Sequence, residues 1–191
     1  QGRFTVTNPS YTVDSQANSI ATGELSGDAQ PDLVVPGGAS SNYQIFVNRG
    51  AKNPLMQRSL NGFVWSGGVS VYDLNKDGRD DIIFGKDAPY LKVHFQNPAG
   101  TFGNSAFGSG TDSSTTPSFG TAAFDWTGDG RLDIVTINSL AAGGTGLTLW
   151  QNEPPTTFSF QGSPQGSLPS AMGVRAIAVR DLNKDSSSDI V

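Results

Sequence analysis

Four short acidic segments at nearly even spacing constrain this chain more than any other feature. The clearest, residues 73–81, reads Asp-Leu-Asn-Lys-Asp-Gly-Arg-Asp-Asp. It carries oxygen-bearing side chains at positions 1, 3, 5 and 9 and a glycine at position 6. Matching segments begin at residues 24, 125 and 181, and an apolar run follows each one. We number them loop 1 (24–32), loop 2 (73–81), loop 3 (125–133) and loop 4 (181–189). Recurrence every 49 to 56 residues predicts a repeat architecture.

The spacing of the oxygens predicts a cation site in each loop. Alternate residues of a tight loop point the same way, so positions 1, 3 and 5 can converge, and position 9 returns from the next strand. Carboxylates gathered this closely repel one another unless a cation lies between them. Hard oxygen ligands in a flexible loop favour calcium, which commonly takes a backbone carbonyl at position 7. The predicted ligands are Glu24, Ser26, Asp28 and Asp32; Asp73, Asn75, Asp77, Arg79 and Asp81; Asp125, Thr127, Asp129, Arg131 and Asp133; and Asp181, Asn183, Asp185 and Asp189.

The four loops are not equivalent. Loop 2 has the most complete ligand set, and loop 3 replaces its amide with the hydroxyl of Thr127. Loop 4 has Ser186 where the turn favours glycine, a change that costs on the order of 1 kcal/mol. Loop 1 departs most, with Glu24 first, Ala29 at position 6 and Pro31 near its end. The alternative for every loop is a turn that its own carboxylates stabilise without metal.

The repeats resemble FG-GAP or VCBS repeats, which occur in integrin α-subunit propellers, some fungal lectins and many secreted bacterial proteins. The resemblance covers essentially the whole chain and includes Thr101-Phe102-Gly103, where the family carries its Phe-Gly pair. It implies an all-β fold, a β-propeller whose repeats each form one four-stranded antiparallel blade. It also implies that each acidic loop joins the first two strands of a blade and binds calcium.

The repeat boundaries predict a single propeller segment over residues 1–191, with about three full blades and a partial blade at each end. We expect repeats at residues 19–66, 67–118 and 119–172, a partial one at 173–191, and the end of a preceding blade at 1–13. Such a segment would be a fragment of a larger propeller, with the ring completed by further chain or another subunit. The polar stretches 105–118 and 162–170 are interpreted as loops between blades. The expected strands are 4–6, 19–23, 33–35, 43–48, 55–60, 69–72, 82–84, 91–96, a short one near Phe102, 121–124, 134–137, 147–151, 157–161, 174–180 and one at Ile190.

Composition narrows the function classes. The net charge is -5 and no basic stripe is present, so we expect no nucleic-acid partner. The chain has no cysteine, which excludes disulfides and thiolate sites, and it has no apolar run long enough for membrane insertion. Calcium can stabilise loops outside the cell, so these features favour a secreted or cell-surface protein.

Alignment of the repeats assigns structural roles to residues that could be taken for functional ones. His94 occupies a strand position held by Ile45 and Leu149 elsewhere, which predicts a packed or half-exposed histidine rather than a catalytic one. Trp126 holds the second loop position, where the other loops have leucine, so we expect it to pack between blades. The side chains of Arg79 and Arg131 are expected to be available for surface contacts.

The acidic residues recur in every repeat, whereas a catalytic residue is needed only once, so we expect no enzyme activity from this chain. The sequence predicts a calcium-stabilised extracellular binding or adhesion module with a carbohydrate or protein ligand. Two alternatives stay open: a segment of a secreted lyase or hydrolase that processes polysaccharide, and a structural arc that assembles with other chains. Candidate ligand contacts on the face opposite the acidic loops are Trp65, Tyr90, Asn42, Lys86 and Asp87.

Overall fold

The computed structural model describes most of the chain. The described residues are 11–13, 17–37, 42–50, 56–61, 66–86, 91–103, 105–107, 120–139, 145–153, 159–168 and 176–191. Within them, all regular secondary structure is β-strand, as the sequence predicts. In this part of the chain no helix is long and apolar enough to cross a membrane.

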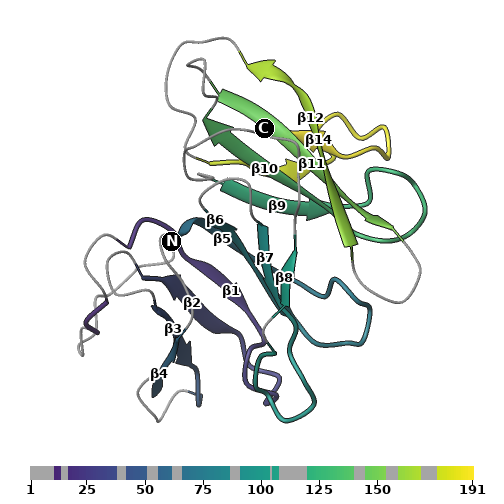
Figure 1. Cartoon of the computed structure of the whole chain (residues 1–191). Helices are drawn as coiled ribbons and strands as arrows, with labels where there is room; N and C mark the ends of the chain where they lie inside the picture. The colour runs from purple at the N-terminus through teal and green to yellow at the C-terminus, as the bar shows by residue number, and fades with distance from the viewer. Residues whose placement is uncertain are drawn as a thin grey trace, which may run out of the picture.

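The strands form three four-stranded antiparallel sheets and one two-stranded ribbon, each built from strands that follow one another in the sequence (Figure 1). Short strands rich in β-branched and aromatic residues, separated by polar turns, favour this arrangement. Sheet 1 contains β1 (Ala21–Gly23), β2 (Asp32–Pro36), β3 (Asn42–Val47) and β4 (Met56–Asn61). Sheet 2 contains β5 (Ser66–Tyr72), β6 (Asp81–Lys86), β7 (Leu91–His94) and β8 (Ser105–Phe107). Sheet 3 contains β9 (Gly120–Phe124), β10 (Asp133–Ser139), β11 (Thr145–Glu153) and β12 (Ser159–Leu168), and the ribbon pairs β13 (Val179–Arg180) with β14 (Asp189–Ile190).

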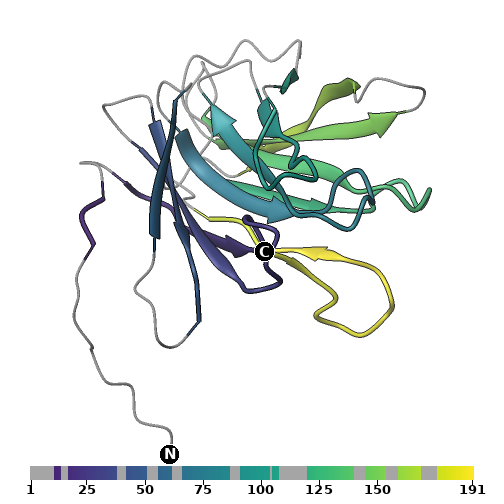
Figure 2. The ribbon, with the colours of Figure 1, turned by 90° about the horizontal axis from the view of Figure 1, so that it is seen from below.

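The first strands of successive sheets lie side by side, and the sheets fan out from this line (Figures 1 and 2). β5 contacts both β1 and β9, and β9 contacts β13. The strands approach so closely that a Cβ on Gly23 would lie 2.2 Å from Val71 Cγ1. The hydroxyls of Ser70 and Thr121 also join β5 to β9 at 2.8 Å. Within the described residues the series of sheets is open and forms no closed ring.

The hydrophobic core consists of layers between successive sheets. The layer between sheets 1 and 2 contains Leu25, Ile45 and Phe84. The layer between sheets 2 and 3 contains Leu74, Ile83 and Trp150. A smaller layer joins sheet 3 to the ribbon through Phe124 and Ile177. Among the described residues, each sheet therefore buries its apolar side chains on a neighbour rather than in a core of its own.

Three of the predicted boundaries were wrong. Within the described part of the strand expected at 174–180, only Val179–Arg180 is a strand. The fourth strand of sheet 2 is Ser105–Phe107, which we expected to open an inter-blade loop, while Phe102 makes only an isolated bridge with Gln96. The fourth strand of sheet 3 continues to Leu168, through residues 162–168 that we assigned to a loop. The Ser, Gly and Pro content of residues 162–168 concealed the fourth strand of sheet 3, and β8 has only three residues. Pairing with a neighbouring strand overrides weak local propensity. The strand predicted at residues 4–6 lies outside the described residues.

Candidate cation-binding loops

The four acidic loops occupy the same place in the fold, between the first and second strands of each sheet and of the ribbon. Their backbones are also alike. Positions 4 and 6 have positive φ in every loop: Gly27 and Ala29, Lys76 and Gly78, Gly128 and Gly130, and Lys184 and Ser186, with φ between 58 and 84°. Glycine adopts this region without steric cost, whereas lysine, alanine and serine do so at a cost. The loop shape therefore does not depend on having glycine at either position.

The first carboxylate of loops 2, 3 and 4 binds the N–H groups of its own loop. In loop 2 the N–H of Asp77 donates to Asp73 Oδ1 at 3.0 Å, and the N–H of Gly78 donates to Asp73 Oδ2 at 2.8 Å. Asp125 accepts the corresponding N–H groups in loop 3, and Asp181 accepts them in loop 4. These contacts hold the carboxylate at position 1 above positions 5 and 6.

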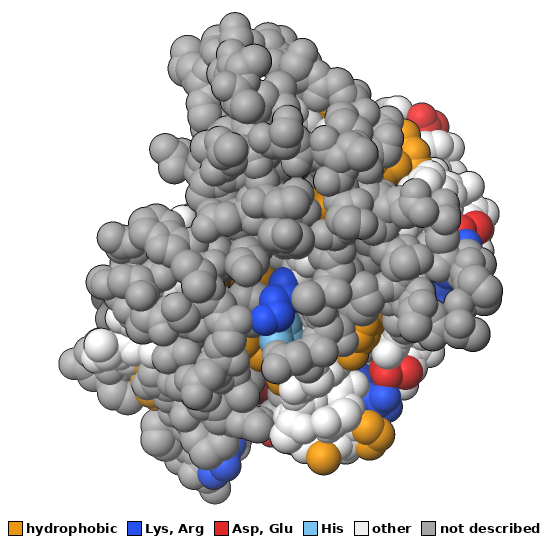
Figure 3. All heavy atoms as spheres, in the orientation of Figure 1, with side chains coloured by type: hydrophobic (Ala, Val, Ile, Leu, Met, Phe, Trp, Pro, Cys, Tyr) orange, Lys and Arg blue, Asp and Glu red, His pale blue; other side chains and the backbone are white. Residues whose placement is uncertain are grey.

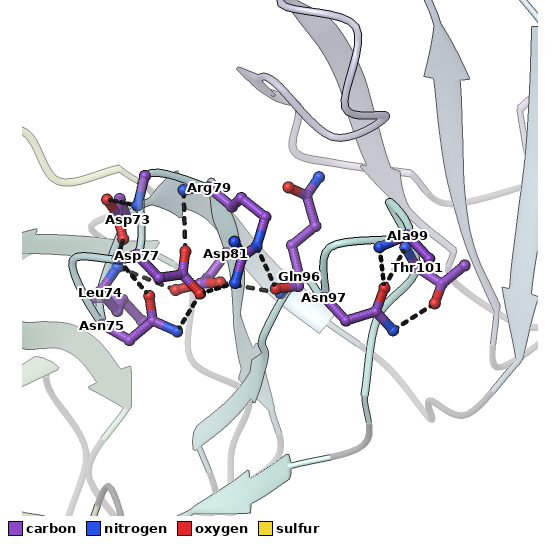
Figure 4. Close-up of polar contacts among 11 residues, drawn as sticks. Asp73, Leu74, Asn75, Asp77, Arg79, Asp81, Gln96, Asn97, Ala99 and Thr101 are labelled. Atoms are coloured by element: carbon purple, nitrogen blue, oxygen red, sulfur yellow. Dashed lines mark hydrogen bonds and ion pairs between the residues drawn. The ribbon is translucent and has the colours of Figure 1, made fainter.

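The fifth position is fixed in the same way throughout. The Oδ1 atom of Asp28, Asp77, Asp129 and Asp185 accepts the N–H of the residue two positions on, at 2.7 to 3.0 Å. In loops 2 and 4 the side-chain amide at position 3 also donates to the carboxylate at position 5, as Figure 4 shows for Asn75 and Asp77. The hydrogen bond from the Arg131 N–H is the largest influence that lowers the pKa of Asp129, and the one from the Ser187 N–H does the same for Asp185.

The ninth position has a different environment. Asp32, Asp81 and Asp133 are fully buried. Asp81 Oδ2 accepts the N–H of Leu74 at position 2, and its Oδ1 accepts the N–H of Gln96 at the end of the third strand, both at 3.0 Å. Asp32 and Asp133 make the same pair of contacts, with Asn48 and Asn152 in place of Gln96. This carboxylate therefore ties the loop to the third strand of its sheet.

Burial raises the pKa of Asp81 to about 7, although the N–H groups of Gln96 and Leu74 act in the opposite direction. The negative charges of Asp77 and Asp73 raise it further. A cation beside these three groups would favour their ionised forms.

We expected the side chains of the arginines at position 7 to be available for surface contacts, but both make contacts within their own repeat. The Arg79 guanidinium pairs with Asp77 and donates from Nε to the carbonyl of Gln96 at 3.1 Å (Figure 4). Arg131 pairs with Asp129 and donates to the carbonyl of Asn152 at 2.7 Å. In the space-filling view, acidic side chains show along the right-hand edge, in places beside basic ones (Figure 3). Each arginine joins position 5 to the end of the third strand.

The donor chemistry tests how well a divalent cation fits these loops. Positions 1 and 5 of loops 2, 3 and 4 place two carboxylates side by side with an amide or hydroxyl at position 3. In loop 2 both oxygens of Asp73 and the Oδ1 of Asp77 accept one N–H each and keep a further acceptor position for calcium, whereas the Oδ2 of Asp77 is already used by Asn75 and Arg79. Among the described residues, however, no group of three or more His, Cys, Asp or Glu side chains lies close enough together to hold a metal ion.

Loop 1 fits a cation least well. Glu24 is one methylene longer than aspartate, and a single oxygen, Oε1, accepts the N–H groups of Ser26, Gly27 and Asp28. The N–H of position 6 has no such bond to Glu24 among the contacts described here. The carboxylate at position 1 of this loop is therefore largely used by its own turn.

The second loop position divides the loops into two pairs. Leu25 and Leu74 are buried between sheets, with exposed fractions of 0% and 2%. Trp126 is 49% exposed and Leu182 is 59% exposed. The prediction that Trp126 packs between blades was therefore wrong for about half of its surface, because loop 4 leaves a gap beside it.

The remaining predicted residues have mixed outcomes. His94 is packed as expected: it is 2% exposed and lies edge-on to Tyr43 and Phe84. Of the candidate ligand contacts, Trp65, Asp87 and Tyr90 lie outside the described residues. Asn42 is the first residue of β3 and Lys86 is the last residue of β6, but the structure does not describe the positions of their side chains.

Asp80 was missed by the sequence reasoning. Its Oδ2 accepts the N–H of Glu24 at 2.7 Å, which links loop 2 to loop 1. Position 8 holds Pro31, Leu132 and Ser188 in the other loops, so the repeat pattern carries no signal for this contact. An acidic residue at a position where the other repeats have none is the one clue that was available.

Comparison with known proteins places the repeats in a family. The model of the FG-GAP-like repeat matches residues 25–84, 73–136 and 125–191, which together cover most of the chain. The chain belongs to the FG-GAP-like repeat family. It is also 34% identical over 82 residues to "Integrin alpha pat-2" of Caenorhabditis elegans, a match that covers 39% of this chain. The chain spans only 7% of the length of that relative.

Proposed function

We propose that this chain is part of an extracellular adhesion or ligand-binding module whose acidic loops bind calcium. The supporting observation is that loops 2, 3 and 4 share one backbone and one pattern of N–H contacts, with two adjacent carboxylates and a third oxygen at position 3. Local turn formation would need one such carboxylate, whereas the repeated set supplies the hard oxygens that calcium prefers. The partial similarity to an integrin alpha chain supports the adhesion role.

In this proposal the sheets are consecutive blades of one β-propeller segment, which further chain or another subunit would complete. The contacts between the first strands of successive sheets support this arrangement. The ligands would be the side-chain oxygens at positions 1, 3 and 5, the carbonyl at position 7 and, after a small movement, the carboxylate at position 9. A bound cation would neutralise adjacent carboxylates and stiffen the loops.

Thermal unfolding in calcium chloride and in EDTA tests the proposal. An ion that binds only the folded loops stabilises the fold by about 3 kcal/mol when its concentration is 100 times the Kd. We expect Asp77→Asn to lose most of the calcium response of loop 2, because it keeps an acceptor for the Arg79 N–H but removes the charge. Asp28→Asn, the matched change in loop 1, should leave the response nearly unchanged. Equal midpoints in calcium and EDTA would refute the calcium-binding role.

A further inference from the structure

Loops 2 and 3 each carry an arginine at position 7 whose side chain turns back towards its own loop. The guanidinium of Arg79 pairs with Asp77 Oδ2, and its Nε donates at 3.1 Å to the backbone carbonyl at the end of the third strand (Figure 4). Arg131 pairs with Asp129 Oδ2, and its Nε donates at 2.7 Å to the matching carbonyl of sheet 3. The same two contacts therefore occur in two separate repeats, both of which have complete four-stranded sheets.

The partner of each guanidinium is the predicted cation ligand at position 5. Each arginine contacts both oxygens of that carboxylate. The main-chain N–H of Arg79 donates to Asp77 Oδ1 at 3.0 Å, and that of Arg131 donates to Asp129 Oδ1 at 2.8 Å, while the guanidinium takes Oδ2. In loop 2 the Oδ2 atom also accepts Asn75 Nδ2 at 2.8 Å. A guanidinium is permanently charged and its planar fork matches a carboxylate, so it supplies a positive charge at the oxygen that a cation would share.

The loop backbone does not need this arginine. Position 7 is Gln30 in loop 1 and Ser187 in loop 4, and in both loops positions 4 and 6 keep their positive φ. The N–H of position 7 also still donates to the Oδ1 atom of position 5, at 2.9 Å for Asp28 and 2.7 Å for Asp185. The main-chain contact thus forms with any residue at position 7, and the guanidinium adds a charge and a link to the third strand.

That charge opposes a cation in the same loop. A calcium ion that takes Oδ2 of position 5 has to displace the guanidinium, and one that takes Oδ1 alone lies close to a positive charge. We propose that Arg79 and Arg131 compete with calcium for position 5, so that each guanidinium acts as an internal counter-ion that keeps its loop closed at low calcium and lowers the calcium affinity of that loop. This inference concerns the regulation of the proposed calcium sites and rests on the proposed function.

The other reading of the same contacts is purely structural. In that reading the arginine only joins its loop to the third strand, and its removal lowers stability without any effect on calcium affinity. Substitution by methionine removes the charge but keeps an unbranched apolar side chain, whereas lysine keeps the charge without the planar fork. A comparison of the two variants therefore separates the charge of the arginine from its geometry.

Calcium titration of the full chain, followed by NMR, tests the proposal loop by loop. The amides of Gly78 and Gly130 report on loops 2 and 3, because each donates to the carboxylate at position 1 of its loop. Both ion pairs are partly exposed, so we expect a moderate effect: Arg79→Met should raise the calcium affinity of loop 2 about fivefold, and Arg131→Met that of loop 3. The unsubstituted loop is the matched control in each variant and should change less than twofold. Arg79→Lys should lie closer to the wild type than to Arg79→Met.

Thermal unfolding supplies a second readout that does not require bound calcium. In EDTA, Arg79→Met should melt below the wild type, because Asp77 loses its counter-ion. The difference between the two midpoints should shrink as calcium is added, since the ion then takes over that role. A purely structural arginine predicts a difference that is the same at every calcium concentration.

The outcomes distinguish this inference from the calcium-binding role itself. A rise in affinity confined to the loop with the substituted arginine supports competition, as does calcium binding by Arg79→Met where the wild type binds none. Equal affinities in the wild type and both methionine variants overturn the inference and leave the calcium-binding role intact. Weaker binding by the variants also overturns it, because the arginine would then prepare position 5 for the ion. A complete lack of calcium response in the wild type and in both variants refutes the proposed calcium sites and the competition together.

Discussion

The first and last junctions of the chain have the same loop backbone but are closed differently. At the junction of sheets 1 and 2, Leu25 is fully buried and Glu24 is held from both sides. Its N–H donates to Asp80, and its carbonyl accepts the Gln96 Nε2 at 3.1 Å. At the junction of sheet 3 and the ribbon, the corresponding space is a groove beside the half-exposed Trp126.

The difference shows that loop shape and junction packing are separable. In every loop the carboxylates at positions 1, 5 and 9 bind N–H groups of the loop itself, whether or not a neighbour covers position 2. Loop 4 keeps these contacts although most of its residues are exposed. Positions 2, 7 and 8 are thus able to vary between packing, polar contact and exposure to solvent without loss of the loop.

The largest expected effect comes from truncating the second loop position at the two ends of the chain. Leu25→Ala should cost about 2–5 kcal/mol, because it opens a cavity in the layer between sheets 1 and 2. Leu182→Ala removes the same atoms from a side chain that is 59% exposed and should cost less than about 0.5 kcal/mol. Urea unfolding of both variants measures the difference. Similar losses would mean that Leu182 is packed as tightly as Leu25.

Sequence reasoning located the loops and the layers because both repeat. The period aligned the third strands, but in sheet 2 by one residue wrongly: His94 pairs with Ile82 and so matches Phe46 and Trp150, not Ile45 and Leu149. It also assigned Leu25 and Leu74 to junctions, where they are packed. Long-range packing in this fold occurs between equivalent positions, so an alignment of the repeats predicts it.

Sequence reasoning could not predict features in which the repeats differ from one another. It also missed backbone conformations that no particular residue type indicates. Lys76 and Lys184 adopt positive φ at position 4, and the presence of a lysine does not predict this conformation. The inward orientation of Asp81 depends on the N–H of Gln96, fifteen residues further along the chain. Trp126 is half exposed where sheet 3 meets a ribbon of two strands instead of a four-stranded sheet, and no hydrophobic pattern signals this. Contacts of this kind follow from the tertiary structure alone.

The second prediction concerns pH and the first junction. His94 lies in the layer between sheets 1 and 2, where Tyr43 of β3 faces it and Lys92 is its charged neighbour on β7. Burial lowers the pKa of His94 from 6.5 to about 4, and the charge of Lys92 lowers it further. Above pH 6.5 His94 is neutral in both the folded and the unfolded state and costs no stability. As the pH falls from 6.5 towards 4, the unfolded state takes up the proton first, and the free energy of unfolding falls by about 3 kcal/mol.

His94→Leu replaces the buried imidazole with an apolar side chain that does not titrate. It should remove this part of the pH dependence, measured as the difference between wild-type and variant unfolding free energies from pH 7 to pH 4.5. Leu149→Ala, a change in the matching strand of sheet 3, should lower stability equally at every pH. Parallel profiles for the wild type and His94→Leu would show that the histidine does not titrate on unfolding.

The smallest expected effect tests the polar link of the first junction against its counterpart in the last. Asp80→Ser places at position 8 the residue that loop 4 has there, and the Glu24 N–H loses its charged acceptor. Because this contact is only partly buried, we expect a loss of about 1–2 kcal/mol. Ser188→Ala, at position 8 of loop 4, should change stability by less than about 0.5 kcal/mol. Amide exchange of Glu24, followed by NMR, should accelerate in Asp80→Ser alone. Unchanged exchange would mean that the contact between Gln96 and the Glu24 carbonyl closes the first junction without this hydrogen bond, and that the carboxylate of Asp80 adds nothing to its stability.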